Sequence, residues 1–324
     1  MTIMKTMNGT AEYIPIPLST IYPDHELGTS FYIRHGSQLE YRLYRSADYP
    51  FEQKDIDALA ADGVRVLYVT AYDFHLYQEY LREALPEIIK NEKVSVQQRF
   101  ESLNLVVRDV LGDVFKSRDI QHIISKSSEL GRQTVELVCR DDVVGPELIK
   151  VLCHDFQTFT HSANVSYYCA LLAKHLGITE RNDLNAIVMG ALLHDIGKIE
   201  VSDKILTKPG RLSSEEFEIM KKHPTDGFLK LKDQKDVSFA QLMMVYQHHE
   251  WQDGRGYPVG ITEEEIHPWA KICTVADVFE ALTSDRPYRS SMPVSKAMEI
   301  MDRESDVHFD EEILRCWKTI ITNN

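Results

Sequence analysis

Apolar and polar residues alternate along four short stretches of the first 90 residues, with the period of two that is typical of β-strands. Between and after them, apolar residues recur at helical spacing. This spacing predicts one helix over 51–62, which Gly63 ends, and a second over 73–90. The pattern therefore predicts a small α+β domain over 1–90. Its expected strands cover residues 13–18, 30–35, 39–44 and 64–70.

Residues 91–145 are predicted to be wholly helical. Their apolar residues recur at alternating spacings of four and three, as in the seam of a coiled coil: Val96, Phe100, Leu103, Val107, Val110 and Val114. The seam covers fewer than three heptads, and Gly112 and residues 116–119 are expected to interrupt it. Two interpretations stay open. Either the helix packs on its own chain, or it forms a homodimer that joins an N-terminal input to a C-terminal output.

Residues 146–324 are predicted to be all-α. Ser213 and Glu216 form a capping box, so a helix is expected to start there and to run to His223, where Pro224 ends or kinks it. Further helices are expected over 239–249 and 270–282, with an irregular loop between them. The fold class is thus an α+β chain of two domains, in which a helical connector over 91–145 joins the small N-terminal domain to the all-α domain.

The composition of the 324 residues is that of an ordinary globular protein, with 43% hydrophobic and 27% charged residues. There are 36 basic and 50 acidic residues, which give a net charge of −14. This excess opposes binding to long nucleic acids or anionic membranes, because both need a basic face. The five cysteines form no CxxC pair, and no apolar leader or 18-residue apolar run is present. We therefore expect a cytoplasmic protein that does not enter a membrane.

Histidine is the unevenly distributed residue, since nine of the 13 lie after residue 150. His194 and Asp195 are adjacent at the end of an apolar helix and are able to ligate one divalent cation together. His248 and His249 reach one metal only at a frayed helix end, which the following glycine loop supplies. With His161, His223 and Asp277, the set comprises imidazoles and carboxylates without a thiolate. It suits iron or manganese better than zinc.

Three motifs, in order, resemble the HD-GYP branch of the HD phosphohydrolase superfamily: HDIGK at 194–198, HHEWQDGRGYP at 248–258 and VADVFEALTSDRPYR at 275–289. The segment over 205–223 fits the same pattern. The resemblance covers roughly residues 150–324, and three ordered motifs are far more specific than an HD pair alone. It implies an all-helical domain that holds two or three metals and cleaves cyclic di-GMP.

Carried over by position, the resemblance assigns one metal to His161, His194, Asp195 and Asp277. Asp195 then bridges to a second metal, held by His223, His248 and His249. Some family members recruit a third metal through a glutamate at the position of Gln157, a poorer ligand, so we expect two. Lys271 and Glu280 replace an arginine and an aspartate that are not ligands.

The resemblance also implies the reaction. A hydroxide that bridges the two metals is expected to attack phosphorus and open cyclic di-GMP to pGpG, and either pGpG or GMP is the end product. Asp195 and Lys198 are the expected catalytic residues. Lys198, Arg286, Arg289 and Tyr257 are the expected substrate contacts, and arginine's fixed fork suits phosphate and guanine alike.

Two alternatives stay open. One is an HD hydrolase for another cyclic dinucleotide, and the other is a non-catalytic sensor or adaptor that binds cyclic di-GMP. The GYP loop, which includes Tyr257, is also a candidate contact for a diguanylate cyclase or an effector protein. A sensor can lose metal ligands, whereas this chain keeps the complete set, which favours the enzyme.

Overall fold

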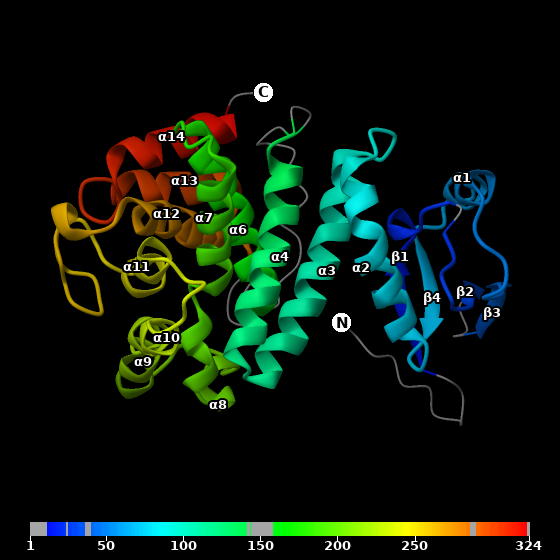
Figure 1. Cartoon of the computed structure of the whole chain (residues 1–324), viewed down its shortest axis with the longest axis horizontal. Helices are drawn as coiled ribbons and strands as arrows, with labels where there is room; N and C mark the ends of the chain where they lie inside the picture. The colour runs from blue at the N-terminus through cyan, green and yellow to red at the C-terminus, as the bar shows by residue number, and fades with distance from the viewer. Residues whose placement is uncertain are drawn as a thin grey trace. The chain divides into compact units, whose positions relative to one another are not determined.

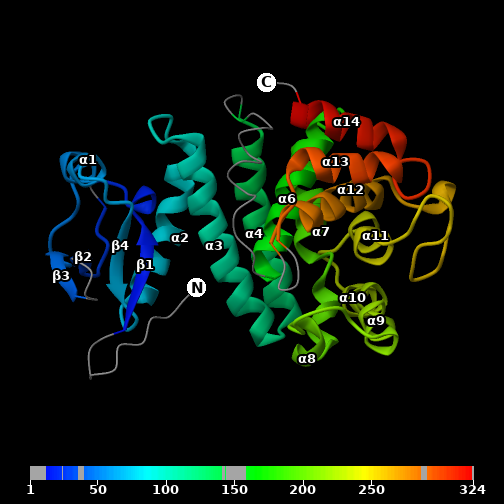
Figure 2. The same cartoon turned by 180° about the vertical axis from the view of Figure 1, so that it is seen from behind.

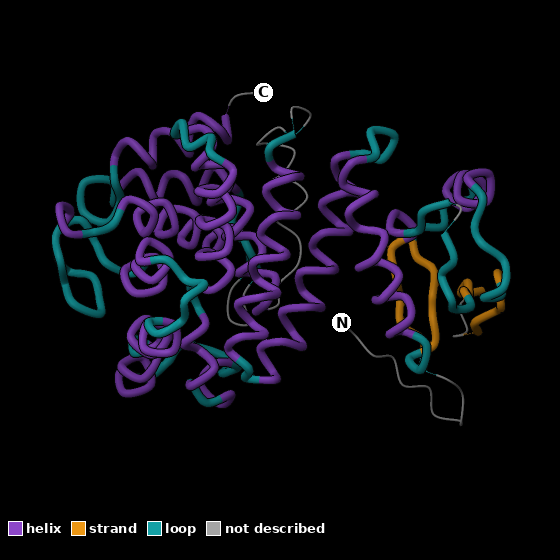
Figure 3. Tube along the Cα trace, in the orientation of Figure 1, coloured by secondary structure: helices purple, strands orange, loops and turns teal. Residues whose placement is uncertain are grey.

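The computed structural model describes residues 12–23, 25–35, 40–140, 143, 158–285 and 290–322. The chain divides into two compact units, Met1–Val106 and Val107–Asn324. Figure 3 shows that strands occur near the N-terminus and that the remainder is mostly helical. Within the described residues, no helix is both long enough and apolar enough to cross a membrane.

An antiparallel sheet with the strand order β1-β4-β2-β3 forms the centre of the first unit. The four predicted strands and both predicted helices are confirmed to within one or two residues at most ends. Their bounds are Tyr13–Pro17 for β1, Phe31–His35 for β2, Glu40–Arg45 for β3, Val66–Thr70 for β4, Gln53–Ala61 for α1 and Phe74–Lys90 for α2; a 3-10 turn, η1, covers Leu18–Thr20.

Strand alternation builds the core of this unit. Ile14 and Ile16 of β1 and Leu67 and Val69 of β4 are buried, while the residues between them are more exposed. Tyr13 lies opposite Thr70 in the register of the two strands. The alternation of apolar and polar residues in the sequence therefore identifies the side chains that lie on the buried face of the sheet.

Two long helices, α3 (Val96–Ser117) and α4 (Ile120–Val138), follow α2 along the chain. The helix runs through Gly112, so the expected interruption there is wrong, but the expected break over 116–119 is confirmed. Arg118 adopts a left-handed φ of 56°, and Asp119 caps α4 by accepting a hydrogen bond from the His122 amide. The segment is thus two helices and not wholly helical, because residues 91–95 precede α3 as turns.

The seam residues of α3 are buried within this single chain, apart from the partly exposed Val96. Burial of Phe100, Leu103 and Val107 leaves them little surface to offer a second copy, which favours packing on the chain itself. The boundary between the two compact units falls after Val106, inside α3. The predicted domain limit at 145 lies outside the described residues, so the three-part division stays a prediction.

A cavity of about 560 Å³ lies in the first unit. Ser19 and the first turns of α3, through Gln97, Gln98 and Glu101, form part of its wall. The Ser19 hydroxyl and the Gln97 amide both donate to the Glu101 carboxylate, at 2.5 and 2.8 Å. These polar side chains therefore satisfy one another.

The described part of the second unit is helical apart from one isolated bridge between Asp253 and Thr262 (Figures 1 and 2). The prediction of an all-α domain is confirmed for these residues. The elements are α6 Thr158–His175, α7 Arg181–Leu193, η2 Ile196–Glu200, α8 Asp203–Leu206, α9 Ser214–Met220, α10 His223–Leu231, α11 Phe239–Gln247, η3 Glu263–Glu265, α12 Pro268–Thr283, α13 Val294–Arg303 and α14 Glu311–Thr322.

The core of this unit is centred on α6. This helix packs against α4, α7, α12 and α14. Rings from three of these helices meet edge to face, with Tyr168 5.4 Å from Phe279 and 5.2 Å from Trp317 between centroids. The packing fixes α6 relative to α12, and each of these two helices carries a predicted metal ligand.

One predicted helix is two helices. The capping box of Ser213 and Glu216 starts α9 as expected, but α9 ends at Met220 and α10 begins at His223. Pro224 occupies the first turn of α10, where its missing amide hydrogen costs nothing. It therefore opens a helix, and the prediction that it ends or kinks one is wrong. The consequence is that His223 lies at a helix start.

Candidate metal centre

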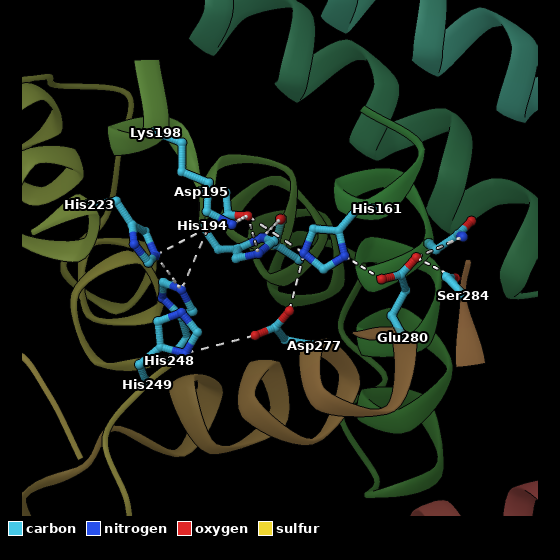
Figure 4. A network of polar contacts seen from close by, with 12 residues as sticks. His161, His194, Asp195, Lys198, His223, His248, His249, Asp277, Glu280 and Ser284 are labelled. Atoms are coloured by element: carbon cyan, nitrogen blue, oxygen red, sulfur yellow. Dashed lines mark hydrogen bonds and ion pairs between the residues drawn. The ribbon is translucent and has the colours of Figure 1, made fainter. Parts of the chain in front are cut away.

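The seven predicted metal ligands come together in the second unit, although they come from separate segments of the chain (Figure 4). Each lies within or at the end of a helix. Six of the seven are buried, and His249 is half-buried. The ligands are His161 of α6, His194 and Asp195 between α7 and η2, His223 of α10, His248 and His249 after α11, and Asp277 of α12.

A first cluster is formed by His161, His194 and Asp195, each of which offers one ligand atom within 4.8 Å of the others. The Nε2 atoms of His161 and His194 lie 3.6 and 3.4 Å from Asp195 Oδ2. Asp277 joins them, with its Oδ1 3.1 Å from His161 Nε2. These are the four residues assigned to one metal in the sequence analysis.

A second cluster is formed by His223, His248 and His249. The Nε2 atoms of His223 and His248 are 3.2 Å apart. α11 ends at Gln247, so the two consecutive histidines leave the regular helix, as their shared role requires. Asp195 Oδ1 lies 3.2 Å from His223 Nε2 and 3.9 Å from His248 Nε2. The two oxygens of Asp195 thus face different clusters.

Hydrogen bonds on the far side of the rings orient the histidines. The Nδ1 atoms of His194, His223 and His248 donate to backbone carbonyls of the preceding helical turn, at 2.6, 2.8 and 3.0 Å. This fixes the tautomer and aims each Nε2 at the cluster. The geometry is that of metal-ligating imidazoles.

Glu280 contacts a predicted metal ligand, and the sequence motifs did not indicate this contact. Its carboxylate accepts a hydrogen bond from His161 Nδ1, and Ser284 Oγ donates to its other oxygen at 2.7 Å. Glu280 follows Asp277 by three residues, which places both on one face of α12. The sequence shows this spacing, but it predicts a contact with His161 only when α6 is known to pack on that face of α12.

The residues fit divalent cations. His194 Nε2 and Asp195 Oδ1 are buried, and neither has a hydrogen-bond partner among the described residues. An unsatisfied buried polar atom costs about 1–3 kcal/mol, so two of them side by side point to a ligand. The donor set of imidazoles and carboxylates, without a thiolate among the clustered residues, is appropriate to such ions.

Burial and charge separate the pKa values of the histidines. Burial lowers the pKa of His161, but the carboxylates of Glu280 and Asp277 outweigh it and raise the value to about 9. For His194, burial is likewise outweighed, mainly by Asp195, and the pKa is also raised to about 9. Burial lowers the pKa of His249 to about 3 and that of His248 well below its usual range. His248 and His249 are thus neutral at pH 7, whereas His161 and His194 are protonated.

We therefore expect metal affinity to rise with pH between about 6.5 and 9. Metal must displace protons from His161 and His194, so each such proton costs about tenfold in affinity per pH unit below its pKa. In the metal-free protein the raised pKa values favour the folded state below pH 6.5, and this contribution is lost as pH rises to 9. Chelator-competition titrations at pH 6.5, 7.5 and 8.5 measure the slope. A pH-independent affinity would contradict the expectation.

Glu280→Gln is expected to weaken metal binding about tenfold while the fold persists. The amide keeps the size of the side chain but removes the charge that holds His161, and such outer partners typically contribute 10- to 100-fold to metal affinity. Competition titration at about pH 10 provides the measurement, because His161 of the unmodified protein has then lost the proton that Glu280 favours and proton competition no longer offsets the effect. Glu299→Gln, on the exposed side of α13, is the matched control. Equal affinity in both variants would show that Glu280 does not position the ligand.

Of the other predicted site residues, the structure describes Lys198 and Tyr257. Lys198 contacts Asp195 through its ammonium group. Tyr257 packs its ring on His249, with centroids 4.7 Å apart, and its amide donates to the His249 carbonyl. Burial, together with the charges of Asp277 and Asp195, raises the pKa of Tyr257, so its hydroxyl stays a hydrogen-bond donor. Gln157, Arg286 and Arg289 lie outside the described residues.

Glu250 holds the GYP loop in place. Its buried carboxylate accepts hydrogen bonds from the amides of Val259 at 2.7 Å and Gly260 at 3.0 Å. A Cβ atom on Gly256 would lie 2.5 Å from the His249 carbonyl oxygen, so only glycine fits there. The loop thus packs against His249, one of the predicted metal ligands.

Comparison with known proteins identifies the family. Residues 147–313 match the model of the HD domain. A solved HDG"Y"P protein from Bdellovibrio bacteriovorus has the same fold, with a TM-score of 0.67, 20% identity, and coverage of 96% of this chain and 100% of its own. The chain therefore belongs to the HD domain family, in the HD-GYP branch that its three motifs predict. Membership implies a divalent metal site, and the two clusters are groups of residues that could hold such ions.

Three curated relatives extend the comparison. A cyclic di-GMP phosphodiesterase of Pseudomonas aeruginosa is 38% identical over 52% of this chain and 41% of its own length. One of Thermotoga maritima is 30% identical over 78% of this chain and 70% of its own. A 3'3'-cGAMP-specific phosphodiesterase of Vibrio cholerae is 39% identical over 50% and 35%, respectively. The matched region is thus well under half the length of the first and third relatives.

Proposed function

We propose that the chain is a metal-dependent phosphodiesterase that hydrolyses cyclic di-GMP to pGpG, and product analysis decides whether pGpG or GMP is the end product. One observation carries the proposal: each of the two oxygens of Asp195 faces one complete cluster of nitrogen and oxygen ligands. Relatives that are 38% and 30% identical over the matched regions bear this activity in their names. Two ions, iron or manganese, match the donor set.

Asp195 and Lys198 have different roles in the proposed reaction. When bound, two divalent ions neutralise phosphate oxygens and lower the pKa of water, which makes hydroxide available near neutral pH. Asp195 holds the two clusters in register. Lys198 lies against Asp195 and also lines the adjoining cavity, so its ammonium group is in place to contact a phosphate. Water oxygen bonds to phosphorus, the P–O3′ bond breaks, and the 3′ oxygen gains a proton.

The test is product analysis on one anaerobic preparation whose metal content has been measured. Protein loaded with iron or manganese should convert cyclic di-GMP to pGpG, and the chelated protein should not. A fully loaded protein without turnover, in the absence of product inhibition, excludes the function. If that protein binds cyclic di-GMP without cleaving it, the chain is a sensor.

A second candidate substrate is 3'3'-cGAMP. It is supported by the identity of 39% to the Vibrio cholerae relative, which is as high as that to the cyclic di-GMP enzymes. The chemistry at phosphorus is the same for both, and only one base differs. Parallel measurement of kcat/KM on the two substrates decides between them.

A further inference from the structure

A cavity of about 640 Å³ adjoins the metal centre in the second unit. Asp195 and Lys198 lie in its wall, so it begins at the reacting end of the site. The rest of the wall includes η2, α8 and the turn between α3 and α4, which lies beside α8 in both views (Figures 1 and 2). The volume lies within the 300–1,000 Å³ usual for small-ligand pockets.

The turn contributes two cations to this wall, Lys116 and Arg118. Both side chains are exposed, and neither forms an ion pair or a side-chain hydrogen bond with any residue that the structure describes. The other charged groups of the wall are partly engaged, since Lys198 contacts Asp195 and Glu200 pairs with Lys230 at 2.6 Å.

Three carboxylates share the wall with these cations: Asp195, Glu200 and Asp203. Lys230 and, to a smaller extent, Arg118 hold the pKa of Glu200 below its usual value, which places the guanidinium near that carboxylate. Asp203 lies at the start of α8. Glu200 is already paired with Lys230, and Asp195 faces the histidine clusters. Asp203 is the carboxylate of the wall that remains, and the two cations of the turn outnumber it, so this part of the wall attracts an anion.

The backbone at Arg118 supports a role for its side chain. Arg118 is the sole non-glycine residue with a left-handed φ in the described chain. That conformation costs about 1–2 kcal/mol for a residue with a Cβ atom, and glycine or asparagine fills it more cheaply. The structure thus bears a strain that brings a guanidinium to this edge of the cavity.

We propose that Lys116 and Arg118 bind the second phosphodiester of the substrate, the one that is not being cleaved. The inference rests on the proposed function, because a cyclic dinucleotide has two phosphates and the metal centre accommodates one. The other must enter the adjoining cavity, where these two cations are available. Arginine's fork matches two phosphate oxygens at once, and lysine adds a point charge.

The test compares two substrates on metal-loaded protein. Cyclic di-GMP has a second phosphate, and bis(p-nitrophenyl) phosphate does not. Lys116→Gln and Arg118→Asn each remove one charge, and asparagine tolerates the left-handed backbone. We expect each variant to raise KM for cyclic di-GMP about tenfold with kcat within threefold, and to leave turnover of the model diester unchanged. Arg118→Lys keeps the charge and should recover most of the affinity.

Lys126→Gln and Arg132→Gln, on α4 outside the cavity, are the matched controls. Unchanged KM in the two turn variants overturns the inference while the proposed function stands. If wild-type protein cleaves the model diester but not cyclic di-GMP, the proposed function fails. The inference is then judged by calorimetric binding of cyclic di-GMP, which must weaken tenfold in Arg118→Asn. Metal content and circular dichroism confirm that each variant is folded.

Discussion

Replacing Asp195 by asparagine is expected to abolish hydrolysis, with a loss of about 1,000-fold or more in kcat. The amide has nearly the same shape but lacks the charge that both clusters share. Loss of several kcal/mol of metal-centred charge stabilisation corresponds to at least this factor. We also expect total metal to fall from two equivalents to one or less. The one remaining ion would be held by the second cluster, which still has three histidine ligands.

Metal analysis and single-turnover kinetics on the same preparation measure both effects. Asp233→Asn, an exposed carboxylate beyond α10, is the matched control. Its metal content and rate should equal those of the unmodified protein. Retention of two metal equivalents by Asp195→Asn would show that the carboxylate does not join the clusters.

The second large effect is expected at Gly197, in the HDIGK motif. A Cβ atom there would lie 1.9 Å from the His223 carbonyl oxygen and 2.7 Å from the Gly227 amide nitrogen. Both are backbone atoms of α10, so η2 and α10 must move apart. Overpacking of this kind costs about 3 kcal/mol, which lowers the melting temperature of a unit of this size by roughly 6–12 °C.

Activity should fall with stability in Gly197→Ala, because the displaced segments include Asp195 and His223. Thermal melts and turnover on one preparation test both. Gly131→Ala in α4 is the control, since its Cβ would meet no atom closer than 3.5 Å and alanine favours the helix. A Gly197→Ala protein with unchanged melting temperature would contradict the close approach of the two segments.

Elements with a strong local signal were predictable from the sequence. The strands around Ile14 and Leu67 alternate clearly, and six of the seven predicted metal ligands lie in motifs whose order is specific, whereas His161 was assigned by its position in the resemblance. The prediction for Pro224 was wrong because proline occurs both after the end of a helix and in its first turn. The sequence alone does not show which of the two positions Pro224 occupies.

The partners of the ligands were harder to predict, because they depend on tertiary packing. The role of Glu280 can be recognised only when α6 places His161 against it, and the turn at Arg118 lines the cavity because α4 packs on α6 and α7. The homodimer and the protein partner of the GYP loop stay predictions.

One helix, α3, lines a cavity in each compact unit, through Gln98 near its start and Lys116 near its end. The helix continues from one compact unit into the other without a break, and eighteen residues of helix span about 27 Å. The two cavity walls therefore share one continuous backbone element, and a substitution near either end of α3 changes a residue of one wall while the other wall keeps its own residues.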